Sequence, residues 1–386
     1  MKPFSLLVKP ASADCNLRCD YCFYLDRSRL YPGSRRHRMS EAVLERLIAS
    51  YMATDQQQYV FGWQGGEPTL MGMDFFRRVT DLQKQYGSAG TVVANGLQTN
   101  ATLIDDRMAR HFEEYRFLLG VSLDGPPAMH DTYRRTGRSR PSHRRVMEGI
   151  RKLARRGVEF NILVLVSSAN VAHPQEVYRY LTDRGFTWQQ YIPCVEFDEE
   201  GKPLPFTITG EEWGRFISGV FDEWAENEAK SVHVRLFDAL LRYMVTGERS
   251  MCRLARDCRE YFVVEYNGDV YPCDFFVSDG LRLGNIMDNS WDELLESPLY
   301  ESFGRGKLET AACCGECEWL EYCAGDCQKH RPAFQGRGAP GPSWLCAGWR
   351  SFFAHAMGRL STIAGELRLA ARPHDGMDCS SGKEQI

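Results

Sequence analysis

The sequence lacks any apolar run that could cross a lipid bilayer. A spanning helix needs about 20 consecutive apolar residues, and no stretch of the 386 residues approaches that length. The first apolar run, residues 4–8, is followed by Lys9 and Pro10, so it is too short for the apolar core of a secretory signal peptide. We therefore expect a cytoplasmic protein with no membrane partner.

The sequence also lacks a large excess of charge of either sign. Its 47 basic and 51 acidic residues leave a net charge of −4, which gives no global attraction to nucleic acid or to a membrane surface. Arginine is concentrated in residues 27–38 and 134–156, but aromatic residues do not alternate with these charges as a base-stacking surface requires. In the second stretch Val146, Ile150 and Leu153 recur on one side of a helix, so most of its charges form a solvated face. We expect no nucleic-acid partner.

Cysteine, in contrast, is abundant, with 14 residues. The content of 43% hydrophobic and 25% charged residues is typical of a soluble globular protein. The chain is long enough for two domains, one of about 230 residues and one smaller. Because disulfides are rare in a reducing compartment, we interpret most of the cysteines as metal ligands.

Three cysteines form a short motif near the start of the chain. Cys15, Cys19 and Cys22 are spaced CxxxCxxC directly after the apolar residues 4–8. A four-iron cluster normally takes four thiolates, so three leave one iron open to a non-protein ligand. An open coordination position is what a catalytic metal site needs. The spacing also fits a zinc site completed by a distant fourth ligand, or buried cysteines without a metal.

Residues 4–196 contain six apolar or β-branched segments, each followed by an amphipathic helical pattern. Strands are expected near residues 4–9, 59–64, 91–98, 117–124, 159–167 and 188–195. Helices are expected near residues 40–54, 73–86, 104–115, 142–157 and 173–185, with a sixth after Thr209. This alternation predicts a parallel sheet with helices outside it, and six units rather than eight indicate an incomplete barrel. The active site of such a sheet lies at the carboxyl ends of its strands.

Glycines and polar residues follow several of these strands. The second strand runs into Gln64 and the Gly-Gly-Glu-Pro of residues 65–68, where paired glycines let the backbone approach a ligand closely. Gln64 would point into the same mouth. The fourth strand ends at Ser122, and Arg134 follows shortly after it. Residues of this kind are either turn formers or ligand contacts.

The strand–helix pattern changes near residue 235, where we place a domain boundary. Two short strands around Asn267 and Gly268 predict a type I′ hairpin, whose second strand delivers Cys273 and Asp274 side by side. The polar tail, residues 371–386 with the further cysteine Cys379, is expected to be disordered.

Eight cysteines of the C-terminal region are enough for two complete four-cysteine sites, of zinc or of iron–sulfur. They are Cys252, Cys258, Cys273, Cys314, Cys317, Cys323, Cys327 and Cys346. Cys313 lies one residue off this pattern and could compete with Cys314. Cys194, at the end of the sixth strand, is expected to be a core residue.

The CxxxCxxC motif, with Tyr21 before its last cysteine, and the Gly-Gly-Glu-Pro of residues 65–68 resemble the signatures of radical S-adenosylmethionine (SAM) enzymes. The resemblance implies a partial (β/α)6 barrel in residues 1–234 that carries a 4Fe-4S cluster with SAM bound at its fourth iron. Cys15, Cys19 and Cys22 would hold that cluster. The residues implied in SAM binding are Tyr21, Gly66 at the amino end, Ser122 and Arg134 at the ribose and carboxylate, and Val195, where family members often have leucine, at the adenine.

The spacing of the C-terminal cysteines resembles the SPASM auxiliary domain, which would occupy residues 235–370 as a small cysteine-rich domain with a β-hairpin. The resemblance implies two further 4Fe-4S clusters with interleaved ligands. The nearer cluster would be held by Cys252, Cys258, Cys273 and Cys327, and the farther one by Cys314, Cys317, Cys323 and Cys346. Because clusters in closed sites can carry an electron away, this arrangement indicates an oxidation.

Residues 1–370 as a whole resemble an anaerobic sulfatase-maturating enzyme, chiefly in residues 63–68, 121–125, 191–194 and 271–276. The resemblance implies that a 5′-deoxyadenosyl radical takes a Cβ hydrogen from a Cys or Ser in a Cys/Ser-x-Pro-x-Arg segment of a sulfatase, giving Cα-formylglycine. Asp274 would be the base, and Tyr24 and Gln64 would contact the substrate. The implied partners are an unfolded or nascent sulfatase polypeptide and an electron donor such as ferredoxin or flavodoxin.

Two alternatives remain open at this stage. A SPASM peptide maturase that forms a thioether or carbon–carbon crosslink should have a peptide-recognition domain before the barrel, whereas the first strand is expected from Phe4. A non-catalytic electron-transfer or zinc-scaffold protein would not need Gly66, Ser122 and Arg134 in register with the cysteine motif. The sequence does not indicate whether Cys or Ser is the preferred target.

Overall fold

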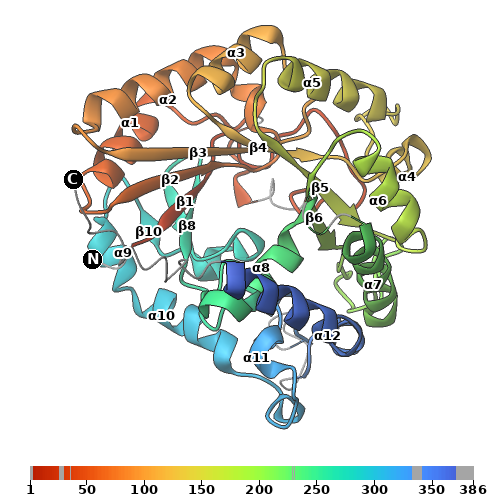
Figure 1. Cartoon of the computed structure of the whole chain (residues 1–386). Helices are drawn as coiled ribbons and strands as arrows, with labels where there is room; N and C mark the ends of the chain where they lie inside the picture. Colours follow the sequence, from red (N-terminus) through yellow and green to blue (C-terminus); the bar gives the residue numbers. More distant parts are fainter. Residues whose placement is uncertain are drawn as a thin grey trace, which may run out of the picture.

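A computed structural model of the chain describes residues 3–25, 30–34, 36–227, 229, 231–332 and 341–370. Within these residues a ten-stranded sheet has the order β10-β9-β8-β1-β2-β3-β4-β5-β6-β7 (Figure 1). Its strands are β1 (Ser5–Lys9), β2 (Gln58–Trp63), β3 (Val92–Thr99), β4 (Leu118–Ser122), β5 (Phe160–Val166), β6 (Trp188–Pro193), β7 (His233–Val234), β8 (Tyr261–Glu265), β9 (Asp269–Tyr271) and β10 (Gly284–Asn285). The predicted tail, residues 371–386 with Cys379, lies outside the described residues.

The α-helices connect these strands or follow them. They are α1 (Glu41–Met52), α2 (Met73–Tyr86), α3 (Asp106–Glu114), α4 (Pro127–Tyr133), α5 (His143–Arg155), α6 (Pro174–Thr182), α7 (Gly210–Asn227), α8 (Arg235–Thr246), α9 (Trp291–Leu295), α10 (Pro298–Arg305), α11 (Leu320–Cys323) and α12 (Cys346–Ala370). Figure 1 shows α1, α2, α3 and α5 along the outer side of the curved strands, and α10, α11 and α12 on the opposite side of the molecule.

The first seven strands form the partial barrel. Each pairs in parallel with the next, from β1–β2 to β6–β7, and within the described residues β7 does not pair back to β1, so the barrel stays open. The six predicted strand–helix units are therefore confirmed. The sequence analysis missed β7 and α4, because two and seven residues are too few for a hydrophobic period to be recognised.

The arginine-rich helix α5 agrees with its predicted role as a solvated surface. Val146, Ile150 and Leu153 are buried in the core. Several of its basic residues are exposed, namely Arg144, Arg145, Arg151 and Arg155. The helix thus turns one apolar side toward the sheet and its charges toward water.

The sheet continues into the cysteine-rich C-terminal region. Strand β8 pairs in parallel with β1, with Leu6 opposite Phe262 and Val8 opposite Val264. The hairpin of β8 and β9 therefore extends the barrel sheet on its β1 side. The domain boundary near residue 235 remains a prediction, since the backbone pairing runs across it.

The prediction of a type I′ turn in this hairpin is wrong. Such a turn needs a positive φ at both central residues. The turn closes instead with Gly268 N–H donating to the Glu265 carbonyl at 2.9 Å, and Gly268, at the end of the turn, has φ +90° while Tyr266 and Asn267 do not have positive φ. The Asn267 amide donates to Asp269 at 2.8 Å, which holds the turn in this form.

Helices α7 and α12 pack through glycines. A Cβ atom on Gly348 would lie 2.0 Å from the Gly210 carbonyl oxygen, and one on Gly214 would lie 2.8 Å from the Gly348 Cα. Only residues without a side chain permit so close a backbone approach. Because α12 begins at Cys346, this contact also fixes the last cysteine of the described chain.

We expect Gly348→Ala to lower the free energy of unfolding by about 1–3 kcal/mol, since the added methyl would overpack the α7–α12 contact. Gly358→Ala is the matched control on the same helix. Nothing lies within 4 Å of its Cβ position, so that variant should be neutral or gain up to about 1 kcal/mol. Denaturant unfolding under anaerobic conditions measures both, and equal stability of the two variants would contradict the packing argument.

Candidate active site

Cys15, Cys19 and Cys22 lie in the loop that follows β1, at the carboxyl ends of the parallel strands. The Cys15 thiol lies within electrostatic reach of the other two. Burial raises the pKa of the Cys19 thiol to about 11; Arg134 opposes this effect and Cys22 reinforces it. Iron binds the thiolate, so a cluster must displace these protons, and the nearby Arg134 favours their loss. The structure thus brings the three predicted ligands together.

Arg134 lies between the cysteine loop and the end of β4. It donates from Nη1 to the Tyr21 hydroxyl at 2.9 Å, and the Tyr21 hydroxyl donates to Asp124. Within the described residues the buried Nε of Arg134 has no hydrogen-bond partner. A guanidinium with an unused donor next to the cysteine loop fits the carboxylate of a SAM molecule bound there.

Gly66 is fixed by the backbone before the cysteine loop. Its N–H donates to the Ser12 carbonyl at 2.8 Å, and a Cβ atom on it would lie 2.2 Å from the Asp14 oxygen. The glycine therefore has a packing role in addition to the predicted contact with the SAM amine. Its neighbour Glu67 is buried and accepts hydrogen bonds from Thr69 at 2.5 and 3.0 Å, from the Thr99 hydroxyl at 2.8 Å and from the Asn100 N–H at 2.7 Å.

The other two predicted SAM-binding residues lie at the same edge of the sheet. Ser122 is the last residue of β4, and Val195 follows β6 by two positions. Both are buried. The backbone of Val195 makes no hydrogen bond to the rest of the described chain, which leaves it available to a ligand. The roles of both residues remain predictions.

Asp274 reaches this edge from the C-terminal region. It follows β9, begins a short 3-10 helix (Asp274–Phe276) and is buried. Its Oδ2 accepts hydrogen bonds from the Tyr24 hydroxyl and from Gln64 Nε2, the latter at 3.1 Å. Burial, together with the Asp274 carboxylate, raises the pKa of Tyr24, so its phenol stays protonated and donates. The structure therefore joins the predicted base to both predicted substrate residues.

The sequence analysis missed Lys9, which lies on the other side of Asp274. Its Nζ is 2.7 Å from Glu265 Oε1 and 3.3 Å from Asp274 Oδ1. Burial opposes the charge of Lys9, but attraction to Asp274 and Glu265 outweighs it and raises the pKa of the ammonium group. The available signal was a lysine at the end of an otherwise apolar strand, which in a buried parallel sheet needs an acidic partner.

Four C-terminal cysteines form a first group. Cys252, Cys258, Cys273 and Cys327 influence one another electrostatically. Burial raises the pKa of Cys258 to about 11, and the buried cation Lys307 acts against it. Gln328 Nε2 donates to the Cys258 sulfur at 3.2 Å. Four thiols with a buried cation and a hydrogen-bond donor beside them fit a closed iron–sulfur site.

The remaining predicted ligands form a second group. Burial raises the pKa of Cys323 to about 12, with Cys346 among the neighbours that contribute. Cys346 in turn interacts with Cys317, and Cys314 interacts with Cys346. Cys313 interacts with Cys314 and Cys346, and its competition with Cys314 remains a prediction.

Family models match both parts of the chain. The radical SAM superfamily matches residues 10–181, and an iron–sulfur cluster-binding domain named SPASM matches residues 252–327. The serine-type anaerobic sulfatase-maturating enzyme of Bacteroides thetaiotaomicron is 34% identical over 383 residues, which cover 95% of this chain and 92% of that protein. The chain belongs to the anaerobic sulfatase-maturating enzyme family.

A cysteine-type member of the family is as similar to the chain as this serine-type enzyme. The cysteine-type enzyme of Clostridium perfringens is also 34% identical, over 95% of this chain and all of that protein. A solved structure of native anSMEcpe with bound AdoMet and Cp18Cys peptide superimposes with a TM-score of 0.87, at 34% identity, over 95% of this chain and 99% of that one. The chain is thus a radical SAM enzyme that uses SAM and 4Fe-4S clusters, as predicted.

The cysteine groups of this family member differ from a single-ion site. Among the described residues, no three His, Cys, Asp or Glu side chains are placed to share one metal ion. A four-iron cluster is larger, because each of its thiolates binds a separate iron.

Cys194 is buried beside Cys19, Tyr21 and Phe206, which confirms it as a core residue.

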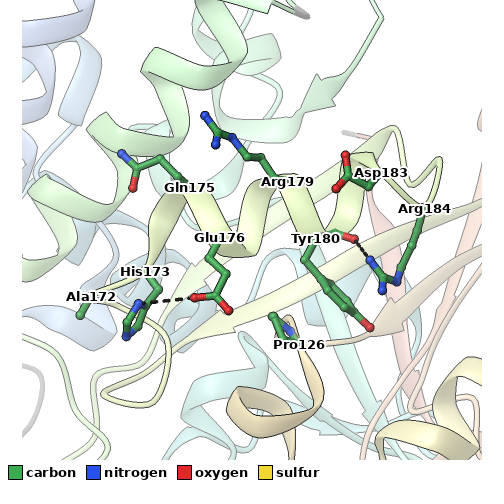
Figure 2. Close-up of a pocket in the computed structure, with 9 residues that line it drawn as sticks. All are labelled: Pro126, Ala172, His173, Gln175, Glu176, Arg179, Tyr180, Asp183 and Arg184. Carbon is green, nitrogen blue, oxygen red and sulfur yellow. Dashed lines mark hydrogen bonds and ion pairs between the residues drawn. The ribbon is translucent and has the colours of Figure 1, made fainter.

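A cavity in the described part of the chain lies away from these groups. It has a volume of about 680 Å³ and follows α6 on the outer surface (Figure 2). Several of its polar side chains already have partners: His173 contacts Glu176 at 3.6 Å, Arg179 contacts Glu223 at 2.8 Å, and Arg184 donates to the Tyr180 carbonyl at 2.9 Å. No helix among the described residues has the length and apolarity needed to cross a membrane.

We expect Gly66→Ala to reduce the iron content by about four atoms per chain, the content of one cluster. The added methyl would collide with the Asp14 carbonyl and displace the cysteine loop. Gly33→Ala, whose Cβ position has nothing within 4 Å, is the control and should keep its iron. Iron and sulfide analysis after anaerobic purification measures both. Wild-type iron content in Gly66→Ala would contradict the packing role.

Proposed function

We propose that the protein oxidises a Cys or Ser side chain of a sulfatase polypeptide to Cα-formylglycine. The observation that carries this proposal is the position of Asp274. The pairing of β8 with β1 brings this carboxylate from the C-terminal region to the mouth of the barrel, between Tyr24, Gln64 and Lys9. The names of the relatives, serine-type and cysteine-type sulfatase-maturating enzymes, support the substrate class.

The residues that would bind the cofactors lie at the mouth of the barrel, and their proposed roles come from the family resemblance. Cys15, Cys19 and Cys22 would hold one cluster, with Arg134 at the SAM carboxylate. The other SAM-binding residues in this proposal are Tyr21, Gly66, Ser122 and Val195. When bound, the cluster and SAM supply a 5′-deoxyadenosyl radical that removes one Cβ hydrogen atom from the substrate.

Asp274 would complete the oxidation by taking a proton. After loss of the Cβ hydrogen atom, the substrate must lose one electron and the proton of its thiol or hydroxyl group. Tyr24 and Gln64 occupy Oδ2, whereas Oδ1 faces the Lys9 ammonium group at 3.3 Å and would be the oxygen that takes that proton. A Ser side chain then becomes the aldehyde directly, and a Cys side chain becomes a thioaldehyde that water converts to the aldehyde with release of hydrogen sulfide.

The electron would leave through the C-terminal cysteine groups. Cys273, a member of the nearer group, directly precedes Asp274. The proton would therefore go to Asp274 and the electron to the cluster held by its neighbour Cys273. The proposed total is three clusters, with the farther one on Cys314, Cys317, Cys323 and Cys346. An unfolded or nascent sulfatase as substrate and ferredoxin or flavodoxin as the reductant of the first cluster complete the proposal.

Peptides with the Cys/Ser-x-Pro-x-Arg segment test the reaction directly. We expect the reduced enzyme with SAM to convert both the Cys and the Ser peptide to one common aldehyde product, detected by mass and by capture with a hydrazine reagent. An Ala peptide is the control and should stay unchanged. SAM cleavage with no aldehyde, and with a crosslinked peptide that has lost two hydrogens, would contradict the proposal and favour a crosslinking maturase.

Asp274→Asn tests the base. We expect this variant to bind SAM as the wild type does, while formation of formylglycine falls by about 10²–10⁴-fold, the usual contribution of a general base. Asp279→Asn, an exposed position in the same segment, is the control and should be fully active. Quantitative mass spectrometry of the product, with SAM binding measured separately, distinguishes them. Full activity of Asp274→Asn would remove this residue from the mechanism.

A further inference from the structure

Lys9 is a fully buried lysine at the end of the central strand β1. Gly65 packs against its side chain: a Cβ atom on Gly65 would lie 3.3 Å from the Lys9 Cβ and 3.5 Å from its Cγ, and 2.5 Å from the Ser12 carbonyl oxygen. The aliphatic part of Lys9 thus passes one glycine of the Gly-Gly pair. Its ammonium group reaches the mouth of the barrel, 4.8 Å from the centre of the Tyr24 ring.

The ammonium group meets two buried carboxylates. Glu265, opposite Lys9 in the β1–β8 pairing, lies 2.7 Å from Nζ, and Asp274 lies 3.3 Å from it. An isolated buried charge is costly, and one lysine here compensates two acidic groups. Apart from this ion pair, neither oxygen of Glu265 accepts a hydrogen bond within the described residues, so Lys9 is its main polar contact.

We propose that Lys9 is the positioning residue of Asp274: its ammonium group fixes Oδ1 and thereby sets the direction in which this carboxylate faces the substrate. The inference deepens the proposed function and rests on it.

Three groups of the barrel hold this one carboxylate of the C-terminal region. Tyr24 and Gln64 both bind Oδ2 and do not contact Oδ1. Lys9 is the described contact at Oδ1, so it restricts rotation of the carboxylate about its Cβ–Cγ bond. Without its cation, Glu265 and Asp274 would also face each other as like charges and separate.

Lys9→Met and Glu265→Gln form a matched pair of variants. Both abolish the 2.7 Å ion pair between β1 and β8, but only Lys9→Met removes the contact with Asp274. The measurement is the ratio of 5′-deoxyadenosine to formylglycine formed from a Cβ-deuterated peptide, since this ratio reports how often hydrogen abstraction leads to product. Iron content, SAM affinity and the KM for the peptide are measured on the same preparations.

We expect Lys9→Met to keep its iron, SAM affinity and peptide KM, to transfer deuterium into 5′-deoxyadenosine, and to raise the ratio by about tenfold or more. The reason is that a small misplacement of a catalytic group can cost on the order of 10²-fold in rate. Glu265→Gln should keep the wild-type ratio. Lys9→Arg should give an intermediate ratio, because a planar guanidinium cannot place its nitrogen where the ammonium stood.

A wild-type ratio in Lys9→Met would overturn the proposal. An equally raised ratio in Glu265→Gln would also overturn it, because Lys9 would then act by holding β1 to β8 and not by its contact with Asp274. If Lys9→Met does not retain iron, Lys9→Arg is the deciding variant. A raised ratio in Lys9→Arg, together with a wild-type ratio in Glu265→Gln, supports the proposal. A wild-type ratio in Lys9→Arg overturns it. Failure of the proposed function is distinguishable, because wild-type enzyme would then cleave SAM without making any formylglycine.

Discussion

The backbone pairing between β1 and β8 is the constraint on which the rest of the site depends. It joins the first strand of the barrel to a strand from the cysteine-rich region in an unbroken parallel register, Ser5 to Lys9 against Tyr261 to Glu265. One end of β1 continues into the cysteine loop, and β8 turns through β9 toward Cys273 and Asp274. The groups proposed to start the oxidation and those proposed to finish it therefore meet at one edge of one sheet.

Buried charge then holds the two regions in register. Lys9 and Gln64 come from the barrel, whereas Glu265 and Asp274 come from the C-terminal region. A buried ion pair adds little net stability, but it penalises any arrangement in which one partner is missing. The network thus favours a single placement of the Asp274 carboxylate over the many that an exposed loop would permit.

Local patterns in the sequence were sufficient for much of the barrel. The six strand–helix units have clear hydrophobic periods, and the spacing of Cys15, Cys19 and Cys22 is itself local, so both could be predicted. The turn at Gly268 was mispredicted because Asn-Gly is also compatible with a turn in which only the last residue is left-handed. The two-residue strand β7 carries no period at all.

The parts that could not be predicted depend on contacts between distant segments. No local feature marks Lys9 as the partner of Asp274, because the contact exists only after β1 and β8 pair. The close approach of Gly210 to Gly348 also depends on distant segments, since in the sequence each glycine alone indicates only a residue of low helix propensity. The roles assigned to Gly66, Ser122, Arg134 and Val195 came from family resemblance, and the structure adds where these residues lie.

The glycine contact between α7 and α12 also bears on the order in which the enzyme matures. Cys346 opens the last helix of the described chain, so it reaches its neighbours Cys317 and Cys314 only after that helix has docked. During synthesis this helix leaves the ribosome well after the cysteine loop of the barrel. If this group binds the proposed farther cluster, its loading is therefore a late event, and a chain that ends before α12 would lack one of the proposed ligands.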